Sequence, residues 1–484
     1  VGGTGRGELF PGSDVDILFA TDGKPTGRIE QIVEFVLYML WDLGLTVGHA
    51  TRSLDETIAR AKGDHTILTA LLEIRWIWGD KALVPEIERR IDADILKRQE
   101  AAFIDAKLGE RDSRHEKMGG SRYQLEPNVK DGKGALRDVH LLIWLAKAAY
   151  GVSNATQLER AGVANRTEIR ALVRAYAFLV ELRCWMHYVT GRTEDRLTFD
   201  LQTEMATRMG FADRAGSIGV ERFMKRYYLA ARDVGALTRV FCAALESSEK
   251  RRMQGLAGRL AAAITPKRAA EGFPIERGRL TAVPAGRFTS QPIEMLRIFR
   301  AAQTTGLDIH PEALRQITAN LKRINADLRA DPEANALFLE ILTAKEDPEQ
   351  ALRRMNEAGV LGRFIPDFGR IVAQAQFNMY HVYTVDEHTL FCIGQLRRIE
   401  RGEHQEALPL STDLAGQITE RRVLYVAMML HDIAKGRPGD HSILGEKVAR
   451  RLCPRLGLDA EETDTVAWLV RWHLLMSDVA FTRE

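Results

Sequence analysis

The chain has 484 residues, of which 45% are hydrophobic and 28% are charged. This is the composition of an ordinary globular protein, and the length predicts about three domains. The 68 Lys and Arg residues nearly balance the 66 Asp and Glu residues, which leaves a net charge of +2. A dedicated nucleic-acid-binding protein usually has a clear basic excess, so we expect no nucleic-acid partner.

No apolar run reaches the roughly 18 residues that a membrane helix needs, so we expect no membrane partner either. The cysteines are far apart and form no Cys-x-x-Cys pair: Cys184, Cys242, Cys392 and Cys453. This pattern predicts reduced thiols and a cytoplasmic protein. Because Val1 is not a natural start and lies inside a motif, we expect the chain to be truncated at both ends.

Residues 1–85 predict a small α/β domain with a mixed sheet. Residues 15–20 form an apolar run that is typical of a buried strand, and residues 29–43 carry apolar side chains at helical spacing. Residues 45–49 have the character of a second strand. This part of the chain is therefore predicted as the core that carries the first site.

A glycine-rich turn with Gly2 and Gly3 precedes two carboxylates, Asp14 and Asp16, by about eleven residues. Residues i and i+2 of a strand point to the same face, so the two carboxylates are predicted to lie side by side. Such a pair repels unless a cation lies between its members, and Mg²⁺ prefers oxygen ligands. Glycine lets the backbone approach a phosphate closely. The motif predicts a nucleotide site with Mg²⁺ or Mn²⁺ bound by both aspartates, and with both glycines lining a triphosphate.

Further residues are candidates for the same site. Glu73 lies in an apolar run, Thr66–Trp78, where a charge is costly without a partner, so we predict it as a third carboxylate. Asp64 is the weaker alternative. Ser13 either caps a turn or contacts phosphate, and Arg6 either pairs with phosphate or forms a surface ion pair.

Residues 86–254 predict an almost wholly helical domain associated with this core, with periodic segments at 88–118, 138–150, 166–190 and 216–247. The first two segments are separated by a glycine-rich loop that leads into a helix at Arg137-Asp138. Its lysines, Lys130 and Lys133, and Arg137 suit contacts with phosphate or base, so we predict them as nucleotide-binding. Ordinary lysines in a loop before a helix are the alternative.

Residues 255–290 are rich in Ala, Arg, Gly and Pro and predict a linker. Residues 291–375 predict a helical connecting region, and residues 376–484 a further all-α domain. The expected fold class is therefore multidomain and predominantly α, with a small α/β core at the N-terminus.

The last segment contains a His-Asp pair, His431-Asp432, at the end of an apolar helix. Both groups are costly to bury without a partner, and together they bind divalent metals well. His388 lies upstream of this pair, and His441 and His473 lie downstream of it. A metal held there would lower the pKa of a bound water and direct hydroxide at a phosphodiester.

The string GGTGRGELFPGSDVDILF resembles the nucleotidyltransferase superfamily, and within it the bacterial PII uridylyltransferase/uridylyl-removing family. The loop from Asn128 to Asp138 resembles an element of that family, with Ala135 at a place often held by glycine. The segment around His431 resembles the HD superfamily of metal-dependent phosphohydrolases. This resemblance implies that a metal is bound by His388, His431 and Asp432, with His441 and His473 as candidate ligands of a second metal or of phosphate. The runs QFNMYHVYTVDEHTL and LHDIAKGRPGDHS extend the resemblance to essentially the whole chain.

The resemblance implies two activities: transfer of UMP from UTP to a tyrosine of the PII nitrogen signal protein, and its hydrolytic removal by the HD domain. It also implies two glutamine-sensing ACT domains, which we expect to be absent from this fragment. The family pattern places a distal metal-binding aspartate just past Glu484, with Asp478 as the alternative within the chain. Lys435 is expected to contact phosphate.

Other functions remain open. tRNA CCA-adding enzymes and poly(A) polymerases also join a nucleotidyltransferase core to HD helices, and residues 293–302 resemble their Arg-x-x-Arg helix. About 200 residues separate that helix from the core here, and the near-neutral charge argues against gripping tRNA phosphates. A protein adenylyltransferase is another alternative, because glycines and aspartates do not reveal the base. A regulatory scaffold without activity would require all these motifs to be vestigial.

Overall fold

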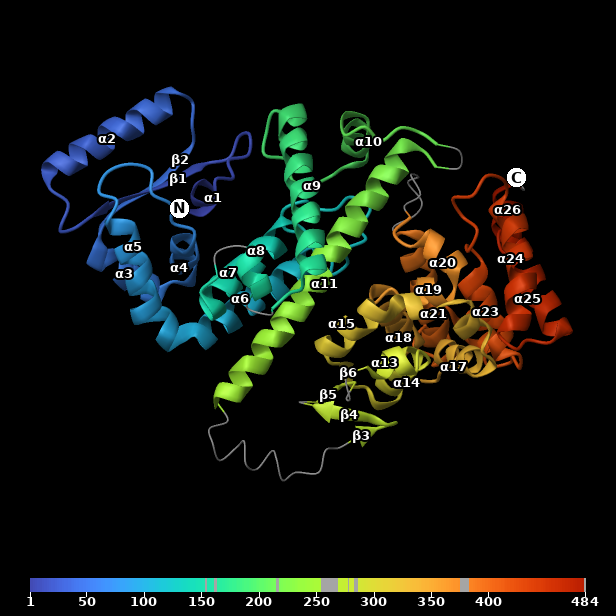
Figure 1. Cartoon of the computed structure of the whole chain (residues 1–484). Helices are drawn as coiled ribbons and strands as arrows, with labels where there is room; N and C mark the ends of the chain where they lie inside the picture. The colour runs from blue at the N-terminus through green and yellow to red at the C-terminus, as the bar shows by residue number, and fades with distance from the viewer. Residues whose placement is uncertain are drawn as a thin grey trace. The chain divides into compact units, whose positions relative to one another are not determined.

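The computed structural model describes residues 1–152, 155–160, 163–214, 217–253, 269–276, 278–282, 286–374 and 383–482. The chain forms two compact units. Unit 1 contains residues 1–122, 126–209 and 230–249, and unit 2 contains residues 123–125, 210–229 and 250–484. Helices dominate both units, which confirms the predicted fold class (Figure 1).

Unit 1 begins with a small α/β layer: α1 (Gly2–Arg6), β1 (Val15–Thr21), α2 (Gly27–Asp42), β2 (Val47–Ser53), α3 (Leu54–Gly63) and α4 (His65–Leu72). β1 and β2 pair in parallel, with Asp16 opposite Gly48, and α2 makes the connection between them. Figure 1 shows α2 beside this strand pair. The short α3 and α4 begin at side-chain caps, Ser53 and Asp64, whose oxygens accept backbone N–H groups.

Several expectations for this layer change. The glycine-rich turn is the short helix α1, which ends at Gly7 in a left-handed conformation (φ 76°). β1 is half-buried rather than buried, because β2 is its one strand neighbour among the described residues. Because β1 and β2 run parallel, the described sheet of the core is parallel rather than mixed. Asp64 is the N-cap of α4, with Oδ1 2.6 Å from the Thr66 amide, which accounts for it without a metal.

The remainder of unit 1 is helical: α5 (Leu83–Arg90), η1 (Ile91–Leu96), α6 (Lys97–Lys117), α7 (Leu136–Tyr150), α8 (Ala155–Arg160), α9 (Arg166–Thr190) and α10 (Phe199–Arg208). The long α11 (Gly219–Met253) contributes residues to both units. Gly134 (φ 81°) lies directly on it, because a Cβ at this position would be 2.2 Å from the Ala231 carbonyl oxygen. This close approach fixes the glycine-rich loop against α11.

Unit 2 contains a four-stranded mixed sheet: β3 (Ala269–Ala270), β4 (Phe273–Glu276), β5 (Arg279–Leu280) and β6 (Asp308–Ile309). β5 and β6 are parallel, and the other neighbours are antiparallel. The described part of the predicted linker therefore belongs to a folded unit, and Phe273, Leu280 and Phe288 are buried in its core. Residues 255–268, 277 and 283–285 of that predicted linker lie outside the described residues.

Helices complete unit 2 in two groups. The first is α13 (Arg287–Ser290), α14 (Glu294–Thr305), α15 (Pro311–Asn320), η2 (Leu321–Arg323), α16 (Ala326–Ala330), α17 (Pro332–Leu342), α18 (Pro348–Glu357), α19 (Val360–Phe364) and α20 (Pro366–Ile371). The second is α21 (Val385–Glu400), α22 (Pro409–Ala415), α23 (Arg421–Leu430), α24 (His441–Arg455), α25 (Ala460–Trp472) and α26 (Leu475–Thr482). One hydrophobic cluster includes side chains of both groups, from Phe273 to Val470.

Among the described residues, no helix is both long and apolar enough to cross a membrane. The four cysteines are free thiols, as the sequence predicts.

Candidate functional site

The first candidate site lies at the start of β1, where Asp14 is exposed and Asp16 is half-buried. Burial raises the pKa of Asp16 above its usual value, and the nearby Asp14 carboxylate raises it further. The two carboxylates are thus close enough to repel each other. A bound cation would relieve this repulsion.

Two glycines flank the Asp16 carboxylate. A Cβ at Gly48, the β2 partner of Asp16, would lie 2.5 Å from its Oδ1, and a Cβ at Gly2 would lie 3.0 Å from its Oδ2. The Asp16 amide donates to the Thr4 hydroxyl at 3.0 Å, which joins α1 to β1. Gly48 was missed in the sequence, where it reads as one glycine in a short apolar strand.

Glu73 is buried, as its apolar surroundings predict, but its partners come from elsewhere. It forms an ion pair with Arg6 and accepts from the Trp144 indole N–H at 2.5 Å. Arg6 also pairs with Glu8 at 3.0 Å, so this guanidinium lies between two carboxylates. Among the described residues, no group of three close potential metal ligands contains Asp14, Asp16 or Glu73. Through its contacts with Arg6 and Trp144, Glu73 connects the end of α4 to α1 and α7.

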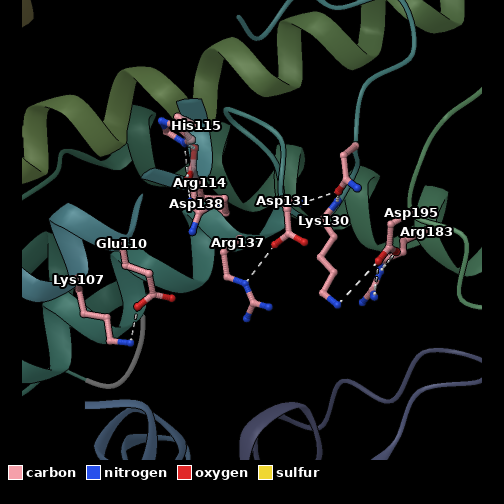
Figure 2. Close-up of polar contacts among 11 residues, drawn as sticks. Lys107, Glu110, Arg114, His115, Lys130, Asp131, Arg137, Asp138, Arg183 and Asp195 are labelled. Atoms are coloured by element: carbon pink, nitrogen blue, oxygen red, sulfur yellow. Dashed lines mark hydrogen bonds and ion pairs between the residues drawn. The ribbon is translucent and has the colours of Figure 1, made fainter. Parts of the chain in front are cut away.

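The loop before α7 is held by its own polar groups (Figure 2). Asn128 Oδ1 accepts from the amides of Lys130 at 3.0 Å and Asp131 at 2.6 Å, which closes a tight turn. The buried Asp138 accepts from the Gly134 amide at 2.7 Å and contacts His115 Nε2 at 3.0 Å. Burial acts to raise the pKa of Asp138, but the contacts with His115, the Gly134 amide and Arg114 outweigh it and lower the pKa.

The predicted basic residues of this loop differ in their contacts. Lys130 and Arg137 extend to the same side in Figure 2, where they pair with Asp195 at 3.8 Å and Asp131 at 3.4 Å. Lys133 instead donates to the Gly120 carbonyl at 3.1 Å. Ser13 is half-buried, and its amide donates to the Phe10 carbonyl at 2.9 Å.

A pocket of about 540 Å³ lies between α4, α6 and α7. More basic than acidic side chains line it. The basic ones are Arg6, Lys107, Arg114, Lys117 and Arg137, and the acidic ones are Glu73, Glu110 and Asp131. An excess of positive charge in a cavity of this size suits a phosphorylated small molecule. The α6 cations share one helix face at spacings of seven and three residues, a signal that we did not single out in the sequence.

Asp195 anchors this loop. Its carboxylate accepts from Arg183 Nε at 2.7 Å, and its backbone carbonyl accepts from the Val129 amide at 2.8 Å. Burial acts to raise the pKa of Asp195, but His187 and Arg183 outweigh it and lower the pKa from 3.8 to about 2. The charged carboxylate therefore stabilises the fold above about pH 4, and this contribution is lost as the pH falls toward 2.

We expect Asp195→Asn to lower the free energy of unfolding by about 2 kcal/mol at pH 7, because a charged acceptor of several hydrogen bonds is lost. The difference from the wild type should shrink as the pH falls from about 4 toward 2. Urea unfolding at pH 7 and pH 3 measures both quantities. The exposed Asp42→Asn is the control, and equal stability of the two variants at pH 7 would contradict the anchoring role.

The second candidate site lies where several helix ends meet in unit 2. His388 is in the first turn of α21, His431 follows α23, His441 begins α24 and His473 follows α25. All four imidazoles face Asp432, which is 2% exposed. Asp432 Oδ2 is 3.2 Å from His431 Nε2 and 4.0 Å from His388 Nε2, and Oδ1 is 3.6 Å from His473 Nε2 and 3.7 Å from His441 Nε2.

Backbone carbonyls orient two of these rings. His431 Nδ1 lies 2.7 Å from the Met428 carbonyl oxygen, and His473 Nδ1 lies 2.8 Å from the Val470 carbonyl oxygen. Because a carbonyl only accepts, each Nδ1 carries a proton, and each Nε2 is the nitrogen that faces Asp432 and is available to a metal. Metal-binding histidines are commonly oriented in this way.

The residues of this cluster fit a divalent metal. Three buried atoms have no hydrogen-bond partner: Asp432 Oδ1, His441 Nε2 and His473 Nε2. The potential ligand atoms form two groups, and within each group they lie within 4.8 Å of one another. One group is His388, His431 and Asp432, and the other is Asp432, His441 and His473. Imidazole and carboxylate ligands suit divalent transition metals, and Asp432 can contribute one oxygen to each group. Asp478 is exposed and belongs to neither group.

Lys435 supplies a positive charge beside the cluster, with Nζ 2.8 Å from Asp432 Oδ2. Burial acts to raise the pKa of Asp432, but His431, His473 and Lys435 outweigh it and hold the pKa far below its usual range. Asp432 is therefore a carboxylate at any physiological pH, which is the form that binds metal.

Comparisons with known proteins give matches in three segments. Residues 102–242 match the model of GlnD PII-uridylyltransferase, residues 273–364 match the uridylyltransferase GlnD third domain, and residues 385–483 match the HD domain. The bifunctional uridylyltransferase/uridylyl-removing enzyme of Azospirillum brasilense is 56% identical over 483 residues, which is 100% of this chain and 52% of the relative. The chain is therefore similar to GlnD uridylyltransferases in these matched segments and to this relative over its whole length.

Two further relatives show a similar level of identity. The enzymes of the same name from Rhodospirillum rubrum and Novosphingobium aromaticivorans are each 52% identical over the whole chain, and the chain covers 51% and 53% of them. The chain thus spans about half the length of the curated relatives it matches. The HD match contains the cluster around Asp432, and the GlnD PII-uridylyltransferase match contains the loop before α7.

One buried carboxylate that was not predicted from the sequence supports the position of His388 in the cluster. Asp386, two residues before His388, accepts from Asn356 Nδ2 at 2.9 Å and from the Ala373 amide at 3.1 Å. Ala373 has φ 58°, an uncommon conformation for a residue with a side chain. These bonds fix the N-terminal turn of α21, and with it the position of His388. The neighbouring residues 375–382, including the first part of the predicted motif, lie outside the described residues.

Proposed function

We propose that the chain carries two opposed activities: transfer of UMP from UTP to a tyrosine of a PII protein, and hydrolytic removal of that UMP. The observation that carries the proposal is the cluster of potential metal ligands around Asp432, in a chain that also holds the Asp14–Asp16 pair. Names of relatives that are 52% to 56% identical describe both activities. Four free thiols support a cytoplasmic location.

In the proposed transfer, Asp14 and Asp16 hold Mg²⁺ or Mn²⁺, which when bound supplies positive charge at the phosphates. Gly2 and Gly3 let the backbone approach the triphosphate. Ser13, Arg6, Lys130, Lys133 and Arg137 are proposed to surround the nucleotide. The tyrosine oxygen forms a bond to the α-phosphorus as the bond to pyrophosphate breaks, and the phenol proton is lost.

In the proposed removal, divalent metal is held by His388, His431, Asp432, His441 and His473. Such a metal, when bound, lowers the pKa of a water. Asp432 forms an ion pair with the Lys435 ammonium. We propose that this ammonium also binds a phosphate oxygen of the substrate. Water oxygen forms a bond to phosphorus while the bond to the tyrosine oxygen breaks. The phenol regains a proton, and UMP leaves.

The tRNA-directed alternative loses support in the structure. Arg297 of α14 pairs with Glu294 at 2.6 Å and also with Glu333, and Arg300 pairs with Glu340 at 3.7 Å. Both arginines of the Arg-x-x-Arg segment are thus engaged by carboxylates of unit 2.

Incubation of the chain with labelled UTP, ATP or CTP tests the proposal, with PII protein and tRNA offered as acceptors. We expect label from UTP on PII. Label from ATP on PII would instead identify an adenylyltransferase, and label from CTP or ATP on tRNA would overturn the proposed transfer.

A further inference from the structure

A second cationic pocket, of about 280 Å³, lies in unit 2. Four basic side chains line it, Lys225, Arg370, Lys435 and Arg437, and of its described lining residues Glu221 is the one carboxylate. Pockets that hold a small molecule have volumes of roughly 300–1,000 Å³. At the lower end of this range, the pocket suits one small anionic ligand.

Lys435 connects this pocket with the histidine cluster. Its side chain is 9% exposed, contacts Asp432 Oδ2 at 2.8 Å and also lines the pocket. A phosphate group beside the cluster would therefore lie within reach of the same lysine. An ammonium has three N–H donors, so Lys435 can serve Asp432 and a phosphate oxygen together.

Lys225 leaves donors for a ligand, and Arg437 is a cation held in place by an acidic residue. Arg437 pairs through Nη2 with Asp367 Oδ1 at 2.7 Å, but its Nε is buried without a hydrogen-bond partner. Lys225 donates to the Arg370 carbonyl at 2.9 Å, which uses one of its three donors. Burial lowers the pKa of Lys225, and a bound anion would oppose that effect.

The wall of the pocket is built by close packing. Gly436 has φ 74°, and a Cβ there would lie 1.6 Å from Gln374 Nε2, so the Gln374 side chain lies directly against this backbone. Gln374 follows Ala373, whose amide is held by the buried Asp386 at 3.1 Å. The Gln374 amide therefore lines the pocket from a fixed turn. It adds a polar group suited to a sugar or base.

We propose that this pocket binds the nucleoside monophosphate part of the hydrolase substrate and retains it as the product, UMP. The inference rests on the proposed function, because it assigns the ligand from the phosphodiester that the neighbouring cluster would cleave. A phosphate dianion matches the cationic lining, and Arg and Lys bind phosphate through charge-assisted hydrogen bonds. The pocket is too small for a folded protein, so the PII part of the substrate would remain outside it.

Calorimetric titration of the whole chain with UMP tests this assignment, with uridine and inorganic phosphate as separate probes. The variants are Arg370→Gln and Lys225→Met, and the matched control is the exposed Arg323→Gln. We expect each pocket variant to raise the dissociation constant of UMP about tenfold, because one charge-assisted contact is lost, and the control to leave it unchanged. Uridine should bind much more weakly than UMP.

Equal dissociation constants in the wild type and both pocket variants would overturn the assignment, and would place any UMP binding elsewhere, such as in unit 1. Phosphate that binds as tightly as UMP would overturn the nucleotide assignment. Hydrolysis of bis(p-nitrophenyl) phosphate by the wild type with Mn²⁺ is measured in parallel. If it is absent, the proposed hydrolase fails, while the titrations still decide whether the pocket binds UMP.

Discussion

Replacement of Asp432 by asparagine is expected to abolish the release of UMP from uridylylated PII, with a rate at least about a thousandfold lower than that of the wild type. Asp432 belongs to both groups of potential metal ligands and lies at the centre of four imidazoles. A neutral amide cannot offer one anionic oxygen to each group. It would also leave the buried Lys435 ammonium without its carboxylate.

Thermal unfolding with and without Mn²⁺ reports the same loss independently of activity. Metal at about 100 times its dissociation constant stabilises a folded protein by about 2.7 kcal/mol, so Tm of the wild type should rise by several degrees. Asp432→Asn should show a smaller rise, because the proposed Asp14–Asp16 site is then the one left to bind Mn²⁺. The matched control is Asp478→Asn, an exposed carboxylate in the same unit that belongs to neither group. Normal UMP release by Asp432→Asn would refute the assignment of this cluster.

Replacement of Asp16 by asparagine is expected to abolish UTP-dependent labelling of PII, again by about a thousandfold or more. Its carboxylate lies between Gly2 and Gly48, where an added Cβ would be 3.0 Å and 2.5 Å from its oxygens. Asparagine has nearly the same volume, so it should fit this space but lack the charge that binds metal. The fold should therefore persist, which circular dichroism and urea unfolding check.

Asp22→Asn is the matched control for this variant, because Asp22 is an exposed aspartate just after β1. We expect it to label PII at the wild-type rate. Labelling by Asp16→Asn at that rate would mean that the Asp14–Asp16 pair is not the transferase metal site.

The histidine cluster shows what sequence reasoning can reach. The resemblance to the HD superfamily implies the set His388, His431, Asp432, His441 and His473, and the structure brings their ligand atoms within 4.8 Å of one another in two groups. Each lies at or near the end of a helix, and helix ends are marked locally by caps such as Asp440, whose Oδ1 accepts from the Ser442 amide at 2.7 Å. The motifs and the family resemblance were therefore sufficient to predict which residues form the cluster, but not the distances between them.

The partners of Glu73 could not be predicted from the sequence. Its apolar neighbours predict a buried charge that needs a partner, and the structure gives it Arg6 and Trp144. These partners are 67 and 71 residues away, so no local pattern identifies them. The strands β3 to β6 were missed for a related reason, because strands of two to four residues have too few positions for an alternating pattern.

The central claim is that one chain adds UMP at one site and removes it at another. The most direct test gives PII that already carries labelled UMP to the Asp16→Asn variant and follows the release of label with Mn²⁺ present. The account predicts release at the wild-type rate, while Asp432→Asn releases none under the same conditions. If Asp16→Asn, folded as the wild type, releases no UMP, the two activities share a site and the account is wrong.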